Sequence, residues 1–493
     1  MTPIYLIIIL IIISSIVYLY KPIRKLIQQK TIYSSCFKTP KSDYIPIFGH
    51  LFSLAGQISK REHYQYFLKY CREYSNEPII CIWFFLWPFL VFRRVDYLEI
   101  FLAAGSKHLT KSPDYTLLDD WLKTGLLITS GKKWKTRRRI ITPSFHNSSL
   151  LANCIDIFNE QLNIGLKHFQ TLANQQVETD LYPLISAWTL DVICETAMGK
   201  TVRAQTEESE YVKAVVRITE LIALRMRSPW LWPRTIFKLS AQGREHDRLL
   251  KIIHKFTRQV IEDRIANFSS IDVRHRMAFL DTLIAKMNDE QISIDDVQEE
   301  GHDTTATAIN FALFMIALHQ DIQQHLFEEI QSIFQNDNER ACTLDDVQQM
   351  NYLECVIKET LRLLPSVPMI GREIQETFQY DGKTFLKGTT VVIFIYEIHR
   401  DPQHFPEPEK FDPDRFLPEL TQQRHPYAYI PFSAGSRNCI GQRFALLEEK
   451  VFLSTIIRRF HLTTSQTYND FVPTEQIILR SDNALKVKLI SRA

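Results

Sequence analysis

The sequence predicts a mainly α-helical protein with small β-sheets, built as a single large domain behind an N-terminal membrane anchor. Three observations support this prediction. Helical periodicity dominates from Val95 to about Gln335. Short alternating segments with Asp381-Gly382 and Lys387-Gly388 turns follow between Phe378 and Tyr396. An uncharged stretch rich in Ile and Leu lies near the start of the chain.

That first stretch, Ile4 to Tyr20, is near the lower length limit for spanning a bilayer. No charged side chain precedes it, and a basic cluster follows, which places the rest of the chain in the cytosol. A cleavable signal peptide fits less well, because there is no basic segment before the apolar run. We therefore expect an anchor at 1–21, a basic, proline-containing hinge at 22–50 and the globular body at 51–493.

Within the body, Ile79 to Phe92 is an apolar and aromatic run that predicts a strand pair. Longer helical patterns are predicted at Leu151–Leu172, Pro183–Met198, Gly243–Ala266, Thr343–Leu364 and Gln442–Arg459. The segment Ser228–Phe237 interrupts the helices with two prolines and two tryptophans. It is either a loop that dips into a membrane interface or a packed core loop.

Composition sets limits on function. The 493 residues are 45% hydrophobic and 12% aromatic, which suits a large apolar interior. The net charge of +2 argues against nucleic-acid binding. The eight cysteines are scattered without a Cys-x-x-Cys pair, so neither a zinc site nor a disulfide framework is expected.

One cysteine stands out by its neighbours. Cys439 lies in Phe432-Ser433-Ala434-Gly435-Ser436-Arg437-Asn438-Cys439-Ile440-Gly441, immediately before a predicted helix. The glycines allow a backbone to make tight turns and to pass close beneath a planar cofactor. Arg437 can neutralise a carboxylate, and a thiolate is a soft metal ligand. A buried, inert cysteine is the simpler explanation of a lone thiol, but not of all these positions together.

This loop resembles the cysteine-ligand loop of the cytochrome P-450 superfamily, Phe-x-x-Gly-x-Arg-x-Cys-x-Gly, without departure. The resemblance extends over about residues 35 to 490 and implies the cytochrome P-450 fold. It implies that Cys439 is the axial ligand of haem b, and that Phe432, Gly435, Arg437 and Gly441 belong to the cofactor-binding loop.

Two further motifs fit the same family. Glu359 and Arg362 are three residues apart on a predicted helix, and Arg415 follows in Pro413-Asp414-Arg415-Phe416. By resemblance they form a structural triad. Trp134 and Arg138 are four apart on one helix face. The resemblance implies that they bind a haem propionate together with Arg372 and Arg437. The surrounding lysines and arginines would form a cationic surface for an acidic electron-donor flavoprotein.

A third motif, Gly301-His302-Asp303-Thr304-Thr305, precedes an apolar helical segment, Ala306 to Leu318. An acid beside a hydroxyl is suited to proton delivery to dioxygen, with Asp303 as relay and Thr304 holding a water. The alternative is a helix N-terminus, where Asp and Thr are favoured caps. With Glu300, the motif resembles family 4, the fatty-acid ω-hydroxylase-like branch, in some members of which the matching glutamate is ester-linked to haem.

The chain departs from family 4 just before this motif. The family reads Glu-Val-Asp-Thr-Phe-Met-Phe-Glu-Gly-His-Asp-Thr-Thr, whereas Val297-Gln298-Glu299-Glu300 leads directly into Gly301. About seven residues are absent, which is roughly 10 Å of helix. Three explanations remain: a helix that begins late, an open distal wall, or a mis-predicted or alternatively spliced sequence.

The resemblance implies a haem-thiolate monooxygenase of the endoplasmic reticulum membrane, with its catalytic domain facing the cytosol. It would use O2 and electrons from NADPH through NADPH–cytochrome P-450 reductase, with cytochrome b5 as a second donor. Its substrates would be apolar: fatty-acid-like, hydrocarbon or xenobiotic. The rivals are an enzyme that rearranges peroxides and an inactive haem- or lipid-binding remnant. By resemblance, the substrate pocket is lined by Val367, Pro368, Met369 and Ile370.

Overall fold

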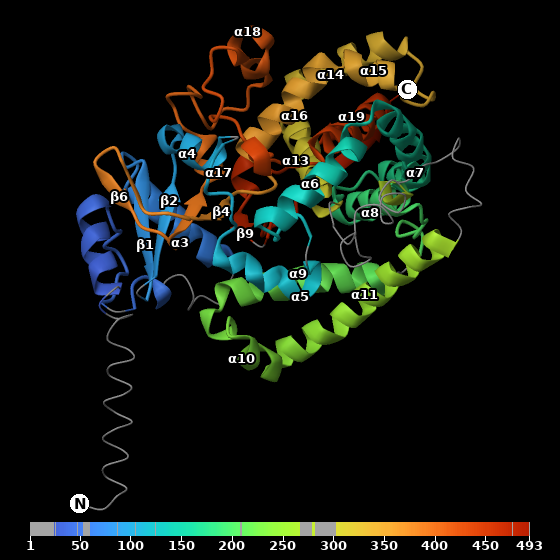
Figure 1. Cartoon of the computed structure of the whole chain (residues 1–493). Coiled ribbons are helices and arrows are strands. Elements are labelled where there is room, and N and C mark those ends of the chain that lie inside the picture. Colours follow the sequence, from blue (N-terminus) through green and yellow to red (C-terminus); the bar gives the residue numbers. More distant parts are fainter. Residues whose placement is uncertain are drawn as a thin grey trace, which may run out of the picture.

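The computed structural model separates a β-rich part from a larger helical part (Figure 1). It describes residues 24, 26–46, 48–52, 60–85, 87–103, 105–123, 125–207, 210–266, 279–281, 302–475 and 477–492. The predicted anchor at 1–21 lies outside these residues. No helix within the described ranges has the length and apolar character needed to cross a membrane.

The largest sheet has four strands in the order β1-β2-β7-β4. Strands β1 (Ile79–Phe84) and β2 (Trp87–Phe92) form an antiparallel pair, which confirms the predicted strand pair. Strand β2 then pairs in parallel with β7 (Thr390–Ile393), and β7 pairs antiparallel with β4 (Ile370–Glu373). Their β-branched and aromatic side chains favour extended backbone.

Three smaller sheets confirm the predicted minor β component. Strands β5 (Phe378–Tyr380) and β6 (Lys383–Phe385) form a hairpin. Its turn residues Asp381 and Gly382 both have positive φ, as a tight two-residue hairpin turn requires. The others are β9 (Pro473–Glu475) with β10 (Leu479–Ser481), and β3 (Thr179–Asp180) with β11 (Lys486–Ser491) and β8 (Phe460–Thr463).

The helices make up most of the remaining described chain, as predicted. Those in the first half are α3 (Lys60–Glu73), α4 (Leu98–Leu102), α5 (Asp119–Leu122), α6 (Gly131–His146), α7 (Ser148–Gln175), α8 (Tyr182–Met198), α9 (Glu210–Arg227), α10 (Arg234–Leu239) and α11 (Ala241–Ala266). Those in the second half are α13 (His302–Leu318), α14 (Gln320–Phe334), α15 (Leu344–Gln349), α16 (Asn351–Leu363), α17 (Ile395–Ile398), α18 (Pro418–Thr421) and α19 (Gln442–Arg459).

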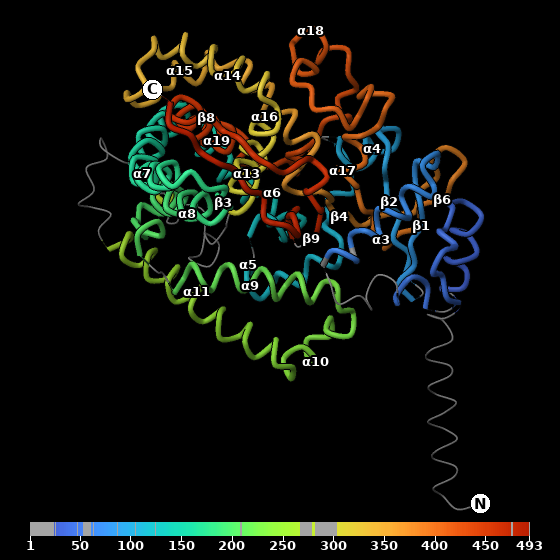
Figure 2. Tube along the Cα trace, turned by 180° about the vertical axis from the view of Figure 1, so that it is seen from behind, coloured from blue at the N-terminus to red at the C-terminus, as the bar shows by residue number. Residues whose placement is uncertain are grey.

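Helix α13 lies at the centre of the helical part. It is apolar on all sides, and Ala306 to Ala317 are buried throughout. Such a helix requires neighbours on every face. It packs against α8, α16 and α19, and β8 lies beside it when the molecule is seen from behind (Figure 2). Because α13 begins at His302, Asp303 and Thr304 lie within its first turn, not before it.

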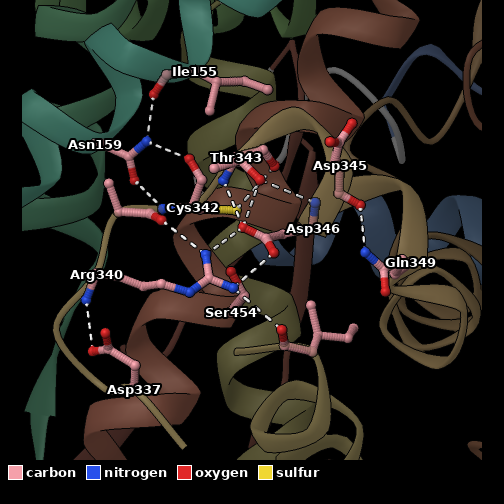
Figure 3. Close-up of polar contacts among 12 residues, drawn as sticks. Ile155, Asn159, Asp337, Arg340, Cys342, Thr343, Asp345, Asp346, Gln349 and Ser454 are labelled. Carbon is pink, nitrogen blue, oxygen red and sulfur yellow. Dashed lines mark hydrogen bonds and ion pairs between the residues drawn. The ribbon is translucent and has the colours of Figure 1, made fainter. Parts of the chain in front are cut away.

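The single helix predicted over Thr343–Leu364 is wrong: the chain forms α15 and α16, which meet at Met350. Thr343 caps α15 in a reciprocal pair of bonds with Asp346. The adjoining loop is fixed by long-range contacts (Figure 3). Asn159 on α7 bonds both the backbone N–H and the carbonyl of Cys342, and Arg340 pairs with Asp346. At the interruption itself, the Glu329 carboxylate of α14 accepts from the Tyr352 and Leu353 N–H groups at the start of α16, so a tertiary contact caps the second helix there.

The segment Ser228–Phe237, for which two readings were open, contains a short 3₁₀ turn (Pro229–Leu231) and the beginning of α10. Phe237 is buried, whereas Trp230 is 55% exposed. The segment therefore packs against the core at one end and presents an aromatic side chain to solvent at the other.

Candidate active site

Cys439 differs from the other cysteines in its exposure. It is the exposed thiol of the eight, whereas Cys36 is half-buried and the remaining six are buried. Burial raises the pKa of Cys71, Cys81 and Cys154, which keeps those thiols protonated. The accessible thiol of Cys439 is thus the one suited to act as a thiolate ligand.

The backbone on either side of Cys439 is closed into a tight loop. The Cys439 N–H donates to the carbonyl of Phe432 at 2.8 Å, and a 3₁₀ turn spans Gly435–Arg437. Helix α19 begins three residues after the cysteine. The loop therefore holds the thiol just before the N-terminus of a long buried helix.

Gly435 is required for a reason that the sequence did not indicate. Its φ is +65°, and a Cβ there would lie 1.7 Å from the carbonyl oxygen of Leu102 in α4. The close approach that demands glycine is therefore to a neighbouring helix. At Gly441, an added Cβ would meet only an ordinary contact, 3.9 Å from Phe145.

Three cationic side chains gather beside this loop: Lys111, Arg372 on β4 and Arg437. Arg437 stacks over the ring of Trp134, 4.0 Å from its centroid, and donates to the carbonyls of Leu126 and Thr129. Burial, followed by repulsion from the nearby charges of Arg372 and Arg138, lowers the pKa of Arg437 to about 10.

Burial also lowers the pKa of the two other members of this cation cluster, Lys111 and Arg372. For Lys111, burial is followed by repulsion from Arg372 and Arg437, which lowers the pKa in the same direction. Mutual repulsion of this kind is costly unless an anion is placed among the cations.

The cation cluster has unused hydrogen-bond donors. The Nε and one terminal nitrogen of Arg372, and the Nε of Arg437, are buried and have no partner among the described residues. Buried guanidinium donors ordinarily bond to carboxylates or carbonyls. The donors present therefore fit the carboxylate groups of a haem, and two of the four predicted propionate residues, Arg372 and Arg437, supply them.

The other two predicted propionate residues lie on α6, beside the same loop. Trp134 is buried, and Arg138 donates to the backbone carbonyl and side-chain oxygen of Asn438. The expectation that every surrounding basic residue is solvated is wrong for Arg137, which is buried. Lys132, Lys133, Lys135 and Arg139 are exposed.

The predicted triad residues do meet. Arg362 forms two bonds to the carboxylate of Glu359, at 2.7 and 2.8 Å, and both side chains are 0% exposed. The Nε of Arg415 lies 3.6 Å from the same carboxylate. Arg362 also donates to three backbone carbonyls, those of His399, Pro408 and Lys410.

The predicted acid–alcohol pair lies at the start of α13, where sequence reasoning missed its partners. The carboxylate of Asp303 accepts hydrogen bonds from the Tyr182 phenol on α8 and the Arg480 guanidinium on β10, both at 2.5 Å. The Thr304 carbonyl accepts from the Ser366 hydroxyl. No local spacing links Tyr182 or Arg480 to Asp303, so only the fold reveals them.

The four predicted pocket residues connect α16 to β4. The Pro368 carbonyl accepts from the Tyr396 N–H, and Ile370 is buried at the start of β4. Val367 is half-buried against the core of the β-rich part, and Met369 against that of the helical part. The segment thus bridges the two parts. Glu300, Gly301 and the shortened stretch before them lie outside the described residues.

Comparisons with known proteins agree with this geometry. The family model described as Cytochrome P450 matches residues 40–489. Cytochrome P450 4V2 of Homo sapiens is 40% identical over 469 residues, which cover 91% of this chain and 88% of that relative. Cytochrome P450 4c3 of Drosophila melanogaster is 40% identical over 418 residues, which cover 79% and 78% respectively.

The fold and the cysteine loop define a haem-thiolate protein, and the chain belongs to the cytochrome P450 family. It is a cytochrome P450 monooxygenase, similar to members that carry family 4 names. The predicted family and enzyme class are confirmed.

Proposed function

We propose that the chain binds haem b through the Cys439 thiolate and hydroxylates apolar substrates with O2 and two electrons from NADPH. The observation that carries this proposal is the set of unpaired buried donors on Arg372 and Arg437 beside the Cys439 loop. Arg138, Arg372, Arg437 and the indole of Trp134 would hold the propionates. The bound haem supplies the activation of dioxygen, which the amino acids lack.

The protein's own part in the reaction is to supply protons and to orient the substrate. Asp303 takes a proton from solvent and passes it towards Thr304, whose hydroxyl holds a water. The Asp303 side chain is 28% exposed, which supports proton exchange with solvent. One oxygen atom enters the substrate C–H bond, and the other leaves as water with two protons.

The substrate site proposed for this chain includes Val367, Pro368, Met369 and Ile370. Their apolar character favours fatty-acid-like molecules, hydrocarbons or xenobiotics, which bind by loss of apolar surface from water. Glu359, Arg362 and Arg415 have a structural role in this proposal, because Glu359 and Arg362 are fully buried and the Arg415 side chain, 10% exposed, lies against the same carboxylate.

The proposed setting is the endoplasmic reticulum membrane, with residues 1–21 as anchor, 22–50 as hinge and 51–493 as the cytosolic catalytic domain. The electron donor would be NADPH–cytochrome P-450 reductase, with cytochrome b5 as a second partner. The exposed Lys132, Lys133, Lys135 and Arg139 suit an acidic partner surface.

The carbon-monoxide difference spectrum of the reduced full-length protein tests the proposal. A strongly red-shifted Soret band is expected for the parent and its loss for Cys439→Ser, because only a thiolate ligand produces that shift. Cys355→Ser, which alters a buried thiol, serves as the control. Folded parent protein without the band would favour the alternative, an inactive haem- or lipid-binding remnant.

Two further measurements test the finer points. Turnover that requires NADPH and reductase supports the monooxygenase, and turnover with peroxide alone contradicts it. Extraction of haem under denaturing conditions tests the ester link through Glu300, because a covalently attached haem stays with the chain.

A further inference from the structure

The carboxylate of Asp303 is held by two elements that are distant in the sequence. The Tyr182 phenol comes from α8 and the Arg480 guanidinium from β10, and both bond to its Oδ1 at 2.5 Å. The guanidinium also stacks on the phenol ring, 4.2 Å from its centroid. The three side chains therefore form one unit at the beginning of α13.

Strand β10 holds the same turn of α13 at two further points. Arg480 donates to the Thr307 hydroxyl, which in turn donates to the Asp303 carbonyl. The preceding residue, Leu479, donates its N–H to the carbonyl of Ser366, whose hydroxyl donates to the Thr304 carbonyl. The backbone carbonyls of both Asp303 and Thr304 are thus linked to strand β10, the first through Thr307 and the second through Ser366.

The charges around Asp303 favour its ionised form. Among the described residues, Arg480 of β10 is a cation that faces it and Tyr182 of α8 is a second donor. Asp180 of β3 accepts from the Tyr182 backbone N–H, and buried Glu448 of α19 bonds Thr305. Burial lowers the pKa of Arg480, but the charges of Asp303 and Tyr182 outweigh this and raise it overall. Burial and the Asp303 charge raise the pKa of Tyr182.

We propose that Arg480, assisted by Tyr182, is a positioning residue that holds the Asp303 carboxylate ionised and turned towards β10. Proton supply then requires this ion pair to lengthen before Asp303 can take a proton from solvent and release it towards Thr304. The proposal rests on the proposed relay role of Asp303.

Strand β10 also connects this ion pair to the interior of the protein. The β9–β10 turn carries Ile478, which is buried, and Ile477, which packs against the core formed by α9 and α11.

The test uses full-length protein and the variants Arg480→Gln, Tyr182→Phe and Asp303→Asn. In Arg480→Gln the carboxylate loses its cation, so the pH at which turnover is half-maximal should rise by about one unit or more. Tyr182→Phe removes one hydrogen-bond donor and should produce a smaller rise. Arg492→Gln is the matched control, because Arg492 stacks on Phe327 and, in the part of the chain that the structure describes, bonds a backbone carbonyl and an amide and no carboxylate.

A thermal-unfolding cycle provides a readout independent of turnover. Arg480→Gln should lower the unfolding temperature of the parent more than that of Asp303→Asn, because the ion pair is already absent from the latter. The proposal would be overturned if Arg480→Gln lowered the unfolding temperature equally in the parent and in Asp303→Asn. It would also be overturned if the pH profile of turnover were unchanged in both Arg480→Gln and Tyr182→Phe. If Asp303→Asn itself leaves turnover and peroxide release unchanged, the proposed relay fails instead.

Discussion

Arg362 on α16 and Arg372 on β4 are both fully buried, yet their surroundings differ. Arg362 bonds the Glu359 carboxylate through Nε and Nη2, and it bonds three backbone carbonyls through Nη1 and Nη2. Arg372 donates to the Gly371 carbonyl and keeps two nitrogens without a partner among the described residues. A buried cation that is fully paired stabilises the fold, whereas one that is left unpaired costs stability and is suited to bind an anion.

The largest effect is expected from Glu359→Gln. It removes the counter-charge of Arg362 and should lower the free energy of unfolding by about 3–5 kcal/mol, because a buried guanidinium is left without a carboxylate. Chemical denaturation measures this change. Glu339→Gln is the control, since Glu339 is 81% exposed in its pair with Arg459 and should change stability by less than about 1 kcal/mol. Equal effects of the two substitutions would contradict the distinction.

Glu449 on α19 is a buried acidic residue that can be compared with these buried cations. Burial raises its pKa from 4.5 to about 8. Below pH 4.5 the carboxyl is protonated in both states; between 4.5 and 8 the unfolded chain loses the proton and the folded chain keeps it. The contribution of Glu449 to stability should therefore fall across that window and level off above it.

Glu449→Gln removes this dependence and should be more stable than the parent at pH 8 by about 2–4 kcal/mol. Thermal or chemical unfolding at several pH values measures the difference between variant and parent. The exposed Glu328→Gln should leave the slope unchanged. A parent and a Glu449→Gln variant with parallel pH profiles would show that Glu449 is ionised in the folded state.

Asn159→Ala tests hydrogen bonds between uncharged buried groups, those that join Asn159 to the Cys342 backbone (Figure 3). It leaves the backbone N–H and carbonyl of Cys342 without their side-chain partner and should cost about 1–3 kcal/mol. Asn174→Ala on the same helix is the control, because Asn174 is exposed and bonds only Gln170 among the contacts described. Equal stability of the two variants would place the anchoring of this loop elsewhere.

Arg372→Met should have the smallest effect on the stability of haem-free protein, within about 1 kcal/mol of the parent, because it removes an unpaired charge. Haem affinity should nevertheless fall about tenfold to a hundredfold, as expected on loss of a charge-assisted hydrogen bond. Haem transfer to a competing apoprotein measures the affinity. Arg225→Met, which removes a buried cation bonded to the Leu231 and Trp232 carbonyls, should destabilise the fold without this loss.

Local patterns predicted much of the framework. The sequence placed helix α19 at Gln442–Arg459 and the strand pair within Ile79–Phe92, both as the structure has them. The three-residue spacing of Glu359 and Arg362 was enough to place them in contact, since residues three apart share a helix face. The interruption at Met350 was missed, because the carboxylate that accepts from the first N–H groups of α16 comes from Glu329 on another helix, α14.

By itself, the sequence determined the family and the enzyme class, and it predicted the cysteine ligand and the acid–alcohol pair, because each depends on residues close together in the chain. The tertiary structure alone decided which groups face them. Leu102 makes Gly435 necessary, Arg372 and Arg437 converge with unpaired donors, and Tyr182 and Arg480 close on Asp303. These contacts join segments that no local periodicity relates, so packing must bring them together before their charges can act on one another.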